Sequence, residues 1–169
     1  MVAEALVARW GFGRAKDRFR GRIVEGQLRP QASGAIPRRG AVRIAVLRPQ
    51  TYYNDAGRSV GPARGALRVA LERVLVVHDE IDLSFGDVRA RKGGGLAGNN
   101  GLKSIKRDLG SADFLRVRVG VGRPDSSDPE IVSAYVLGRF RESQAQVNEL
   151  IERACAQVER IVLGEDQPD

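Results

Sequence analysis

The chain has one cysteine, one histidine and no long hydrophobic run. Cys155 alone cannot form an internal disulfide or a cysteine-based zinc site, which is typical of proteins from a reducing cytoplasm. The longest apolar run covers residues 74–77, far short of the roughly 20 residues that cross a bilayer. The N-terminus lacks the basic start, apolar stretch and small-residue cleavage site of a signal peptide. We therefore expect a cytoplasmic protein that does not span a membrane.

The single histidine also restricts the chemistry. His78 and Cys155 stand 77 positions apart in the sequence, and together they are too few for a typical zinc site. A Ser-His-Asp triad could use only His78. We therefore expect no metal site.

The composition is that of a folded domain with a basic surface. The 169 residues are 42 % hydrophobic and 29 % charged, which is ordinary for one domain of this length. We expect a single domain spanning residues 1–169. The 28 Lys and Arg residues exceed the 21 Asp and Glu residues and give a net charge of +7. Such a balance favours a polyanionic partner such as nucleic acid.

Hydrophobic periodicity predicts an α/β domain. The expected helices cover residues 2–10, 55–70, 102–109, 130 onward and 144–162, and the expected strands cover residues 19–26, 41–47, 74–77, 88–91 and 115–122. A loose, basic turn with Pro30, Gly34 and Pro37 separates the first two strands. Strands that alternate with helices indicate a mixed, mostly parallel sheet flanked by helices. The continuous apolar run at 74–77 is typical of a strand buried on both faces.

Three loops that follow predicted strands carry amides or carboxylates, at residues 51–54, 78–82 and 93–101. Loops at the ends of strands are where α/β sheets place their ligand sites. Asp79 follows the apolar strand, where a carboxylate can orient a histidine or a water; the alternative is a turn or helix-capping aspartate. His78 points to the opposite face if the strand continues. A structural histidine is therefore the favoured interpretation of His78.

The glycine-rich loop at 93–101 lies among basic residues. Its backbone N–H groups could hold a phosphate, although it lacks the Gly-Lys-Ser/Thr of a Walker loop. Period-two geometry places Arg89 and Arg91 on one strand face, and likewise Arg116 and Arg118. These arginines could form a basic surface suited to a phosphate backbone. The alternative is a solvated sheet edge that is kept basic against aggregation.

Four motifs, in this order and spacing, closely resemble bacterial peptidyl-tRNA hydrolases over nearly the whole chain. They are PQTYYNDAG at 49–57, VVHDEIDL at 76–83, KGGGLAGNNGLK at 92–103 and FLRVRVGVGRP at 114–124. The resemblance implies a monomeric α/β fold with a mixed sheet. It also implies hydrolysis of the ester that joins a peptide to the tRNA 3′ end, which recycles tRNA from stalled translation without a metal or cofactor.

The resemblance assigns roles to individual residues. Asp79 matches the carboxylate that holds a histidine general base in its useful tautomer, and Asn54 and Asn100 match asparagines that bind and orient substrate and water. Tyr52 matches an aromatic that lines the site for the tRNA end. The positions that grip the tRNA phosphate match Arg89, Arg91 and Arg118.

The chain also departs from the family pattern. The family opens with a strand and a Gly-Leu-Gly-Asn-Pro-Gly loop, followed by a Thr-Arg-His-Asn segment that carries the general base. These segments have no counterpart here, and His78 does not replace the base because the family has its own residue at that position. Asn99 stands where the family commonly has histidine, a tolerable variation. We expect a shortened product or a misplaced start, with the first strand missing and hydrolysis impaired.

Two other functions remain open at this stage. One is a catalytically inactive relative that binds tRNA or another RNA through the basic surface. The intact Asp79, Asn54 and Asn100 argue against it. The other is a generic basic α/β domain with an unrelated small ligand. Hydrolysis compared with simple tRNA binding separates the enzyme from the pure binder.

Overall fold

The computed structural model describes residues 1–29 and 40–168 of the chain. Most of the basic turn predicted between the first two strands lies outside these residues. The described helices are α1 Val2–Arg9, α2 Gly57–Leu67, α3 Asn100–Leu109, α4 Pro129–Leu137 and α5 Gln144–Leu163, with short 3₁₀ turns η1 Tyr53–Asp55 and η2 Leu71–Arg73. The described strands are β1 Lys16–Arg18, β2 Gly21–Leu28, β3 Val42–Pro49, β4 Leu75–Glu80, β5 Val88–Lys92 and β6 Leu115–Gly120. The α/β class predicted from periodicity is confirmed.

The described strands form two three-stranded sheets, in the orders β1-β2-β3 and β4-β6-β5. The first sheet is antiparallel throughout, and in the second β4 pairs with β6 in parallel while β5 pairs with β6 antiparallel. Antiparallel pairing therefore outweighs the mostly parallel pairing expected from the sequence. The reason is that β1, β2 and β3 follow one another with no helix among the described residues between them, and only a crossover connection can join parallel strands.

The short strand β1 has no counterpart among the predicted strands. It is joined to β2 by Phe19 and Arg20, whose φ angles are +55° and +52°. Positive φ at both central residues is the geometry of a two-residue type I′ hairpin, which usually carries Asn-Gly. Because Phe-Arg is not a recognisable hairpin sequence, the turn could not be predicted locally. The Arg18 guanidinium lies 4.6 Å from the centre of the Phe19 ring, a cation–π contact that favours the turn.

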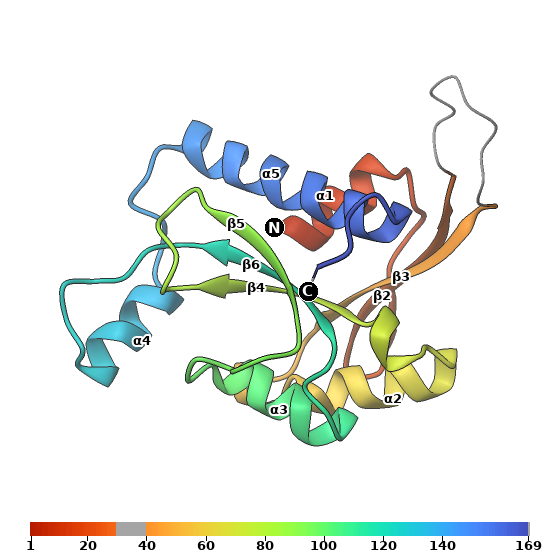
Figure 1. The fold of residues 1–169 in the computed structure, drawn as a ribbon, viewed down its shortest axis with the longest axis horizontal. Coiled ribbons are helices and arrows are strands. Elements are labelled where there is room, and N and C mark those ends of the chain that lie inside the picture. Colours follow the sequence, from red (N-terminus) through yellow and green to blue (C-terminus); the bar gives the residue numbers. More distant parts are fainter. Residues whose placement is uncertain (30–39, 169) are drawn as a thin grey trace.

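The sheets lie between two helical layers (Figure 1), with α1 and α5 on one side and α2 and α3 on the other. Val117 and Val119 of β6 pack against Leu6 of α1 and against α5 in the larger buried cluster. On the other side, Leu102 and the rest of the α3 apolar face form a second cluster with Phe114. Neighbouring strand residues point to opposite faces, so β6 contributes its odd-numbered side chains to α5 and its even-numbered ones to the α3 side.

The closing helix α5 begins where the sequence predicts. Ser143 and Gln146 form a capping box, in which the Ser143 Oγ accepts from the Gln146 N–H and the Gln146 Oε1 accepts from the Ser143 N–H. Reciprocal capping satisfies two backbone donors that the first helical turn leaves free. None of the helices in the described part of the chain is long and apolar enough to cross a membrane.

Strand β4 is less buried than its sequence predicts. Residues 75–79 are only partly buried, although a run of this kind is typical of a strand covered on both faces. The cause is position, because β4 stands at one end of its sheet and pairs only with β6 among the described strands. The other edge of β4 has no ladder partner there.

Helices α2 and α3 pack closely at Gly57, and the contribution of this contact to stability can be measured. A Cβ at Gly57 would lie 2.2 Å from the Ser104 carbonyl oxygen. We expect Gly57→Ala to force the two helices apart and lower the free energy of unfolding by about 1–3 kcal/mol or more, measured by urea denaturation. Gly65 is the matched control because a Cβ there would meet nothing within 4 Å. Gly65→Ala should raise stability by about 0.5–1 kcal/mol, and equal losses in both variants would contradict the packing account.

Candidate active site

Asn54 and Asn100 come from two elements that pack together. Asn54 lies in η1, and Asn100 is the first residue of α3. The approach is close, because a Cβ at Gly101 would lie 2.9 Å from the Tyr53 ring. Both asparagine side chains are exposed. An amide can donate and accept without titrating, so this pair forms a surface suited to orienting a polar substrate.

Asn99 has a structural role. Its Oδ1 accepts a hydrogen bond from the Leu102 N–H at 2.8 Å, which caps the N-terminus of α3. Asparagine is among the best residues for this position. The neighbour Asn100 is therefore held at the start of the helix, with its amide free apart from a 3.4 Å contact with Lys103 Nζ.

The two adjacent tyrosines differ in environment. Tyr52, the aromatic assigned from the sequence, is 85 % exposed, whereas Tyr53 is 48 % exposed and packs on Gly101. Burial and the negative charge of Asp79 raise the pKa of the Tyr53 hydroxyl to about 12, against the opposing effect of a hydrogen bond to the Gly101 backbone. The Asp79 charge therefore acts on Tyr53, which packs at the start of α3. Sequence reasoning did not single out Tyr53, and only its position beside Asn54 could have suggested it.

Asp79 and His78 lie on opposite faces of β4, as predicted. In the register with β6, His78 is opposite Arg118 and Asp79 is opposite Val119. The His78 Nδ1 lies 2.7 Å from the Asp79 backbone oxygen, so the proton on Nδ1 is donated to the main chain. Burial lowers the pKa of His78, which favours its neutral form. The His78 ring is therefore not directed to the Asp79 carboxylate.

The Asp79 carboxylate is half-buried at the end of β4. Among residues 1–29 and 40–168, no hydrogen bond or ion pair engages it, and none joins it to Asn54 or Asn100. Its relation to the site is electrostatic, through Tyr53. A carboxylate without hydrogen-bond or ion-pair partners retains its lone pairs for a further donor such as an imidazole N–H.

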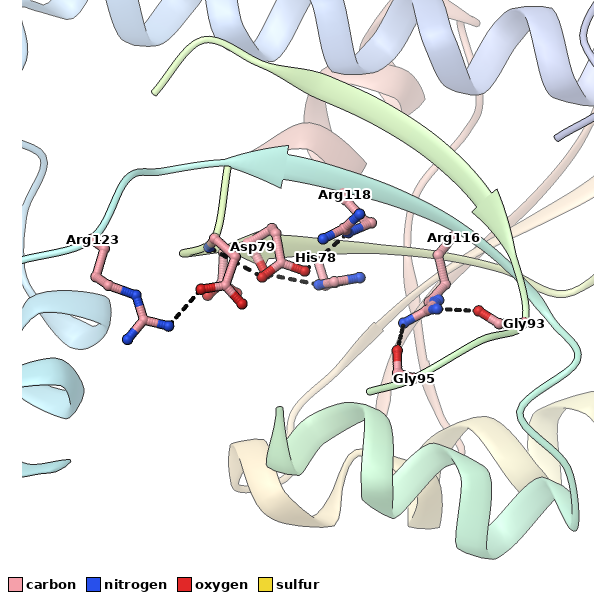
Figure 2. A network of polar contacts seen from close by, with 9 residues as sticks. His78, Asp79, Gly93, Gly95, Arg116, Arg118 and Arg123 are labelled. Carbon is pink, nitrogen blue, oxygen red and sulfur yellow. Dashed lines mark hydrogen bonds and ion pairs between the residues drawn. The ribbon is translucent and has the colours of Figure 1, made fainter. Parts of the chain in front are cut away.

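Four arginines share one face of the second sheet, as the alternation predicts. Arg89 lies opposite Arg118, and Arg91 lies opposite Arg116. The Arg89 side chain is 63 % exposed. Arg118 is partly covered, and its Nε donates to the buried Glu80 carboxylate at 3.0 Å (Figure 2). Glu80 thus fixes one edge of the Arg118 guanidinium. The guanidinium groups of Arg89, Arg91 and Arg118 create a positive field beside the glycine-rich loop.

Arg116 differs from the other three arginines because it is only 2 % exposed. The sequence groups it with Arg118 on a basic surface, but its guanidinium is turned into the protein and donates to the Gly93 and Gly95 carbonyls. Periodicity gives the face of a strand and cannot tell whether a loop covers that face. In the described part of the chain, no group of three or more His, Cys, Asp or Glu side chains is placed to hold a metal ion.

Comparisons with known proteins point to one family over nearly the whole chain. The sequence pattern of the family described as peptidyl-tRNA hydrolase matches residues 1–168. A peptidyl-tRNA hydrolase of Phenylobacterium zucineum is 39 % identical over 169 residues, covering 99 % of this chain and 76 % of that protein. One of Caulobacter vibrioides is 40 % identical over 146 residues, covering 86 % of this chain and 66 % of its own length.

Solved structures show the same arrangement. The crystal structure of peptidyl-tRNA hydrolase from Acinetobacter baumannii superposes with a TM-score of 0.79 at 31 % sequence identity, covering 97 % of this chain and 78 % of that one.

Proposed function

Because the chain belongs to the peptidyl-tRNA hydrolase family, we propose that it acts on the ester between a peptide and the 3′ end of tRNA. The observation that supports the proposal is the packing of η1 on α3, because these two elements carry Asn54 and Asn100. The proposal includes a cytoplasmic, monomeric protein whose partner is peptidyl-tRNA.

Ester hydrolysis requires an oriented water, a base that takes its proton and donors for the carbonyl oxygen as it becomes negative. The side-chain amides of Asn54 and Asn100 can bind the peptide carbonyl and the water. Asp79 can hold an imidazole in the right tautomer and stabilise its charged form. These roles match those that the sequence motifs imply.

The general base of this mechanism has so far not been assigned to a residue. The chain has one histidine, and the His78 Nδ1 is committed to the backbone oxygen of Asp79. We assign the base to a histidine of the Thr-Arg-His-Asn kind that the family pattern places ahead of the motifs described above. Residues 1–169 alone are then expected to hydrolyse slowly, since a general base contributes about 10²–10⁴-fold in rate.

The arginine face supplies the affinity for RNA in this proposal. Arg89 and Arg91 on β5 and Arg118 on β6 lie within one small area of the sheet. A guanidinium presents a planar fork of donors that matches phosphate oxygens. Contacts with phosphate position the nucleic acid without reading its sequence, which suits a protein that acts on the common end of many tRNAs.

Hydrolysis and binding, measured on the same preparation, test the proposal. We expect an excess of the protein to release N-acetyl-amino acid from N-acetyl-aminoacyl-tRNA faster than buffer does, and Asn100→Ala to remove most of that gain. Binding of deacylated tRNA should change little in this variant, because the amide acts on the ester end. Tight binding with hydrolysis no faster than in buffer, even when a histidine-bearing segment is supplied, would make the chain an RNA-binding protein instead.

A further inference from the structure

Arg116 is a charged side chain enclosed within the protein. It lies in β6 and is only 2 % exposed. Its Nη1 donates to the Gly95 carbonyl oxygen at 3.0 Å and its Nη2 donates to the Gly93 carbonyl oxygen (Figure 2). Burying a charge is costly unless hydrogen bonds replace those to water. The two carbonyls supply the hydrogen bonds of both Nη atoms, while the Nε is buried without a partner among the described residues, so the position of Arg116 and the course of residues 93–95 depend on each other.

Gly94 in the same loop lies against a second arginine. Gly93 and Gly94 have φ angles of +59° and +80°, and a Cβ on Gly94 would lie 2.5 Å from the Arg91 guanidinium. Arg91 is the direct cross-strand neighbour of Arg116. Arg91 therefore lies against the loop while Arg116 binds its carbonyl groups. The left-handed backbone favours glycine at both positions.

The segment after these glycines leads directly to the site. The Gly93 N–H donates to the Phe114 carbonyl, and the Asn99 N–H donates to the Leu96 carbonyl at 2.8 Å. Asn99 then caps α3, and Asn100 follows. Few hydrogen bonds other than those of Arg116 tie residues 94–98 to the sheet in the described structure. Leu96 packs against the α3 core cluster, and we expect displacement of Gly95 to pass through Leu96 and the Asn99 cap to the Asn100 amide.

We propose that Arg116 is a positioning residue for ester hydrolysis, which acts by fixing the backbone of residues 93–95 and thereby the Asn100 amide, and does not bind RNA phosphate. The inference rests on the proposed function for its catalytic consequence. It separates Arg116 in role from Arg89, Arg91 and Arg118, although strand alternation places all four arginines on one face of the sheet.

The choice of arginine follows from the geometry. Two carbonyls must be reached from one side chain, and a planar guanidinium offers several donors in a fixed fork, whereas an ammonium is a compact point charge. Burial lowers the pKa of Arg116, and the nearby charges of Arg91 and Arg118 lower it further. A guanidinium remains protonated under such conditions, while a buried lysine can lose its proton. Lysine is therefore expected to be a poor replacement.

The test compares two substrates, one with phosphates and one without. The first is N-acetyl-aminoacyl-tRNA and the second is the N-acetyl-aminoacyl ester of adenosine. Arg116→Met should lower kcat by about 10²-fold on both, because a misplacement of about 1 Å can cost that much. Arg116→Lys should lower kcat nearly as much on both substrates. The Kd for deacylated tRNA should stay within about 3-fold. A loss confined to the tRNA substrate and seen in KM would overturn the proposal, as would unchanged kcat on both substrates.

Two further arginines serve as comparisons. Arg118→Ala should raise the Kd for tRNA and reduce the slope of log affinity against log salt by about one, the signature expected of a phosphate ligand and not of Arg116. Arg153 lies on α5, on the other side of the sheet, and pairs with Glu149. Arg153→Ala should leave both hydrolysis rates unchanged. A salt slope reduced in Arg116→Met as much as in Arg118→Ala would contradict a positioning role.

Amide hydrogen exchange supplies a readout that does not depend on activity. In Arg116→Met, exchange at the hydrogen-bonded amides of Gly93, Asn99 and Leu102 should rise by about 10-fold or more, while β2 and β3 stay protected, because protection reports local opening. Unchanged exchange at these three amides would overturn the proposal. If the protein hydrolyses neither substrate even when the histidine-bearing segment is supplied, the proposed function fails and this measurement still decides the positioning role. If Arg116→Met does not fold, Arg116→Lys provides the same comparison.

Discussion

A histidine-bearing segment placed ahead of residue 1 is expected to raise kcat for peptidyl-tRNA hydrolysis by about 10²–10⁴-fold, the usual contribution of a general base. The segment would carry the Gly-Leu-Gly-Asn-Pro-Gly and Thr-Arg-His-Asn sequences of the family pattern. The physical reason is that Asp79 is half-buried, free of partners among the described residues and able to accept an imidazole N–H. The only histidine of the chain, His78, donates to a backbone oxygen instead.

The control for this experiment is the same extended protein with the histidine of the added segment changed to alanine. It retains any stabilisation that the added residues bring and lacks only the base. Single-turnover hydrolysis of N-acetyl-aminoacyl-tRNA measures both forms and residues 1–169 alone. Equal rates for the histidine and alanine forms would show that the base lies elsewhere.

The second large effect is expected at Asp79. In the histidine-bearing form, Asp79→Ala should lower kcat by about 10²-fold or more and leave the Kd for tRNA unchanged. The carboxylate stabilises the charged imidazole that forms when water loses its proton. It contributes nothing to the arginine face, because Asp79 is opposite Val119 in the sheet register and His78 is the residue opposite Arg118.

Asp82 is the matched control for Asp79. It follows β4 on the same loop and forms an ion pair with Arg123. Exposed pairs of this kind contribute little to stability, so Asp82→Ala should change kcat by less than about 3-fold. Asp79→Ala would lose its assigned role if kcat and tRNA affinity fell by the same factor, or if Asp82→Ala had an equal effect.

Local sequence patterns predicted the elements that carry a clear period. The amphipathic residues 144–162 form α5, and the alternating residues from 115 onward form β6. The opposite faces of His78 and Asp79 and the shared face of Arg89 and Arg91 also follow from alternation alone. These features depend on near neighbours in the chain, which a sequence records directly.

The features that could not be predicted depend on distant partners. Whether β4 is central or at an edge depends on which strands join it, and the Phe19-Arg20 turn depends on the β1–β2 pairing. The burial of Arg116 depends on a loop that folds back over its face. In the same way, Tyr53 lies beside the candidate site only because α3 packs on η1. The sequence therefore grouped the candidate residues, and the tertiary structure decided which of them are exposed and which are buried.

The packing of α1 on α5 has a consequence for synthesis of the chain. Leu6 is buried against α5, and the Trp10 indole N–H donates to Glu159 at 2.7 Å, across about 150 residues of sequence. Translation at about 5–20 residues per second separates the emergence of these two helices by roughly 8–30 s. Throughout that interval the face of α1 that packs on α5 has no native cover. The larger core therefore closes only after α5 has been synthesised, so its completion comes late in the synthesis of residues 1–169.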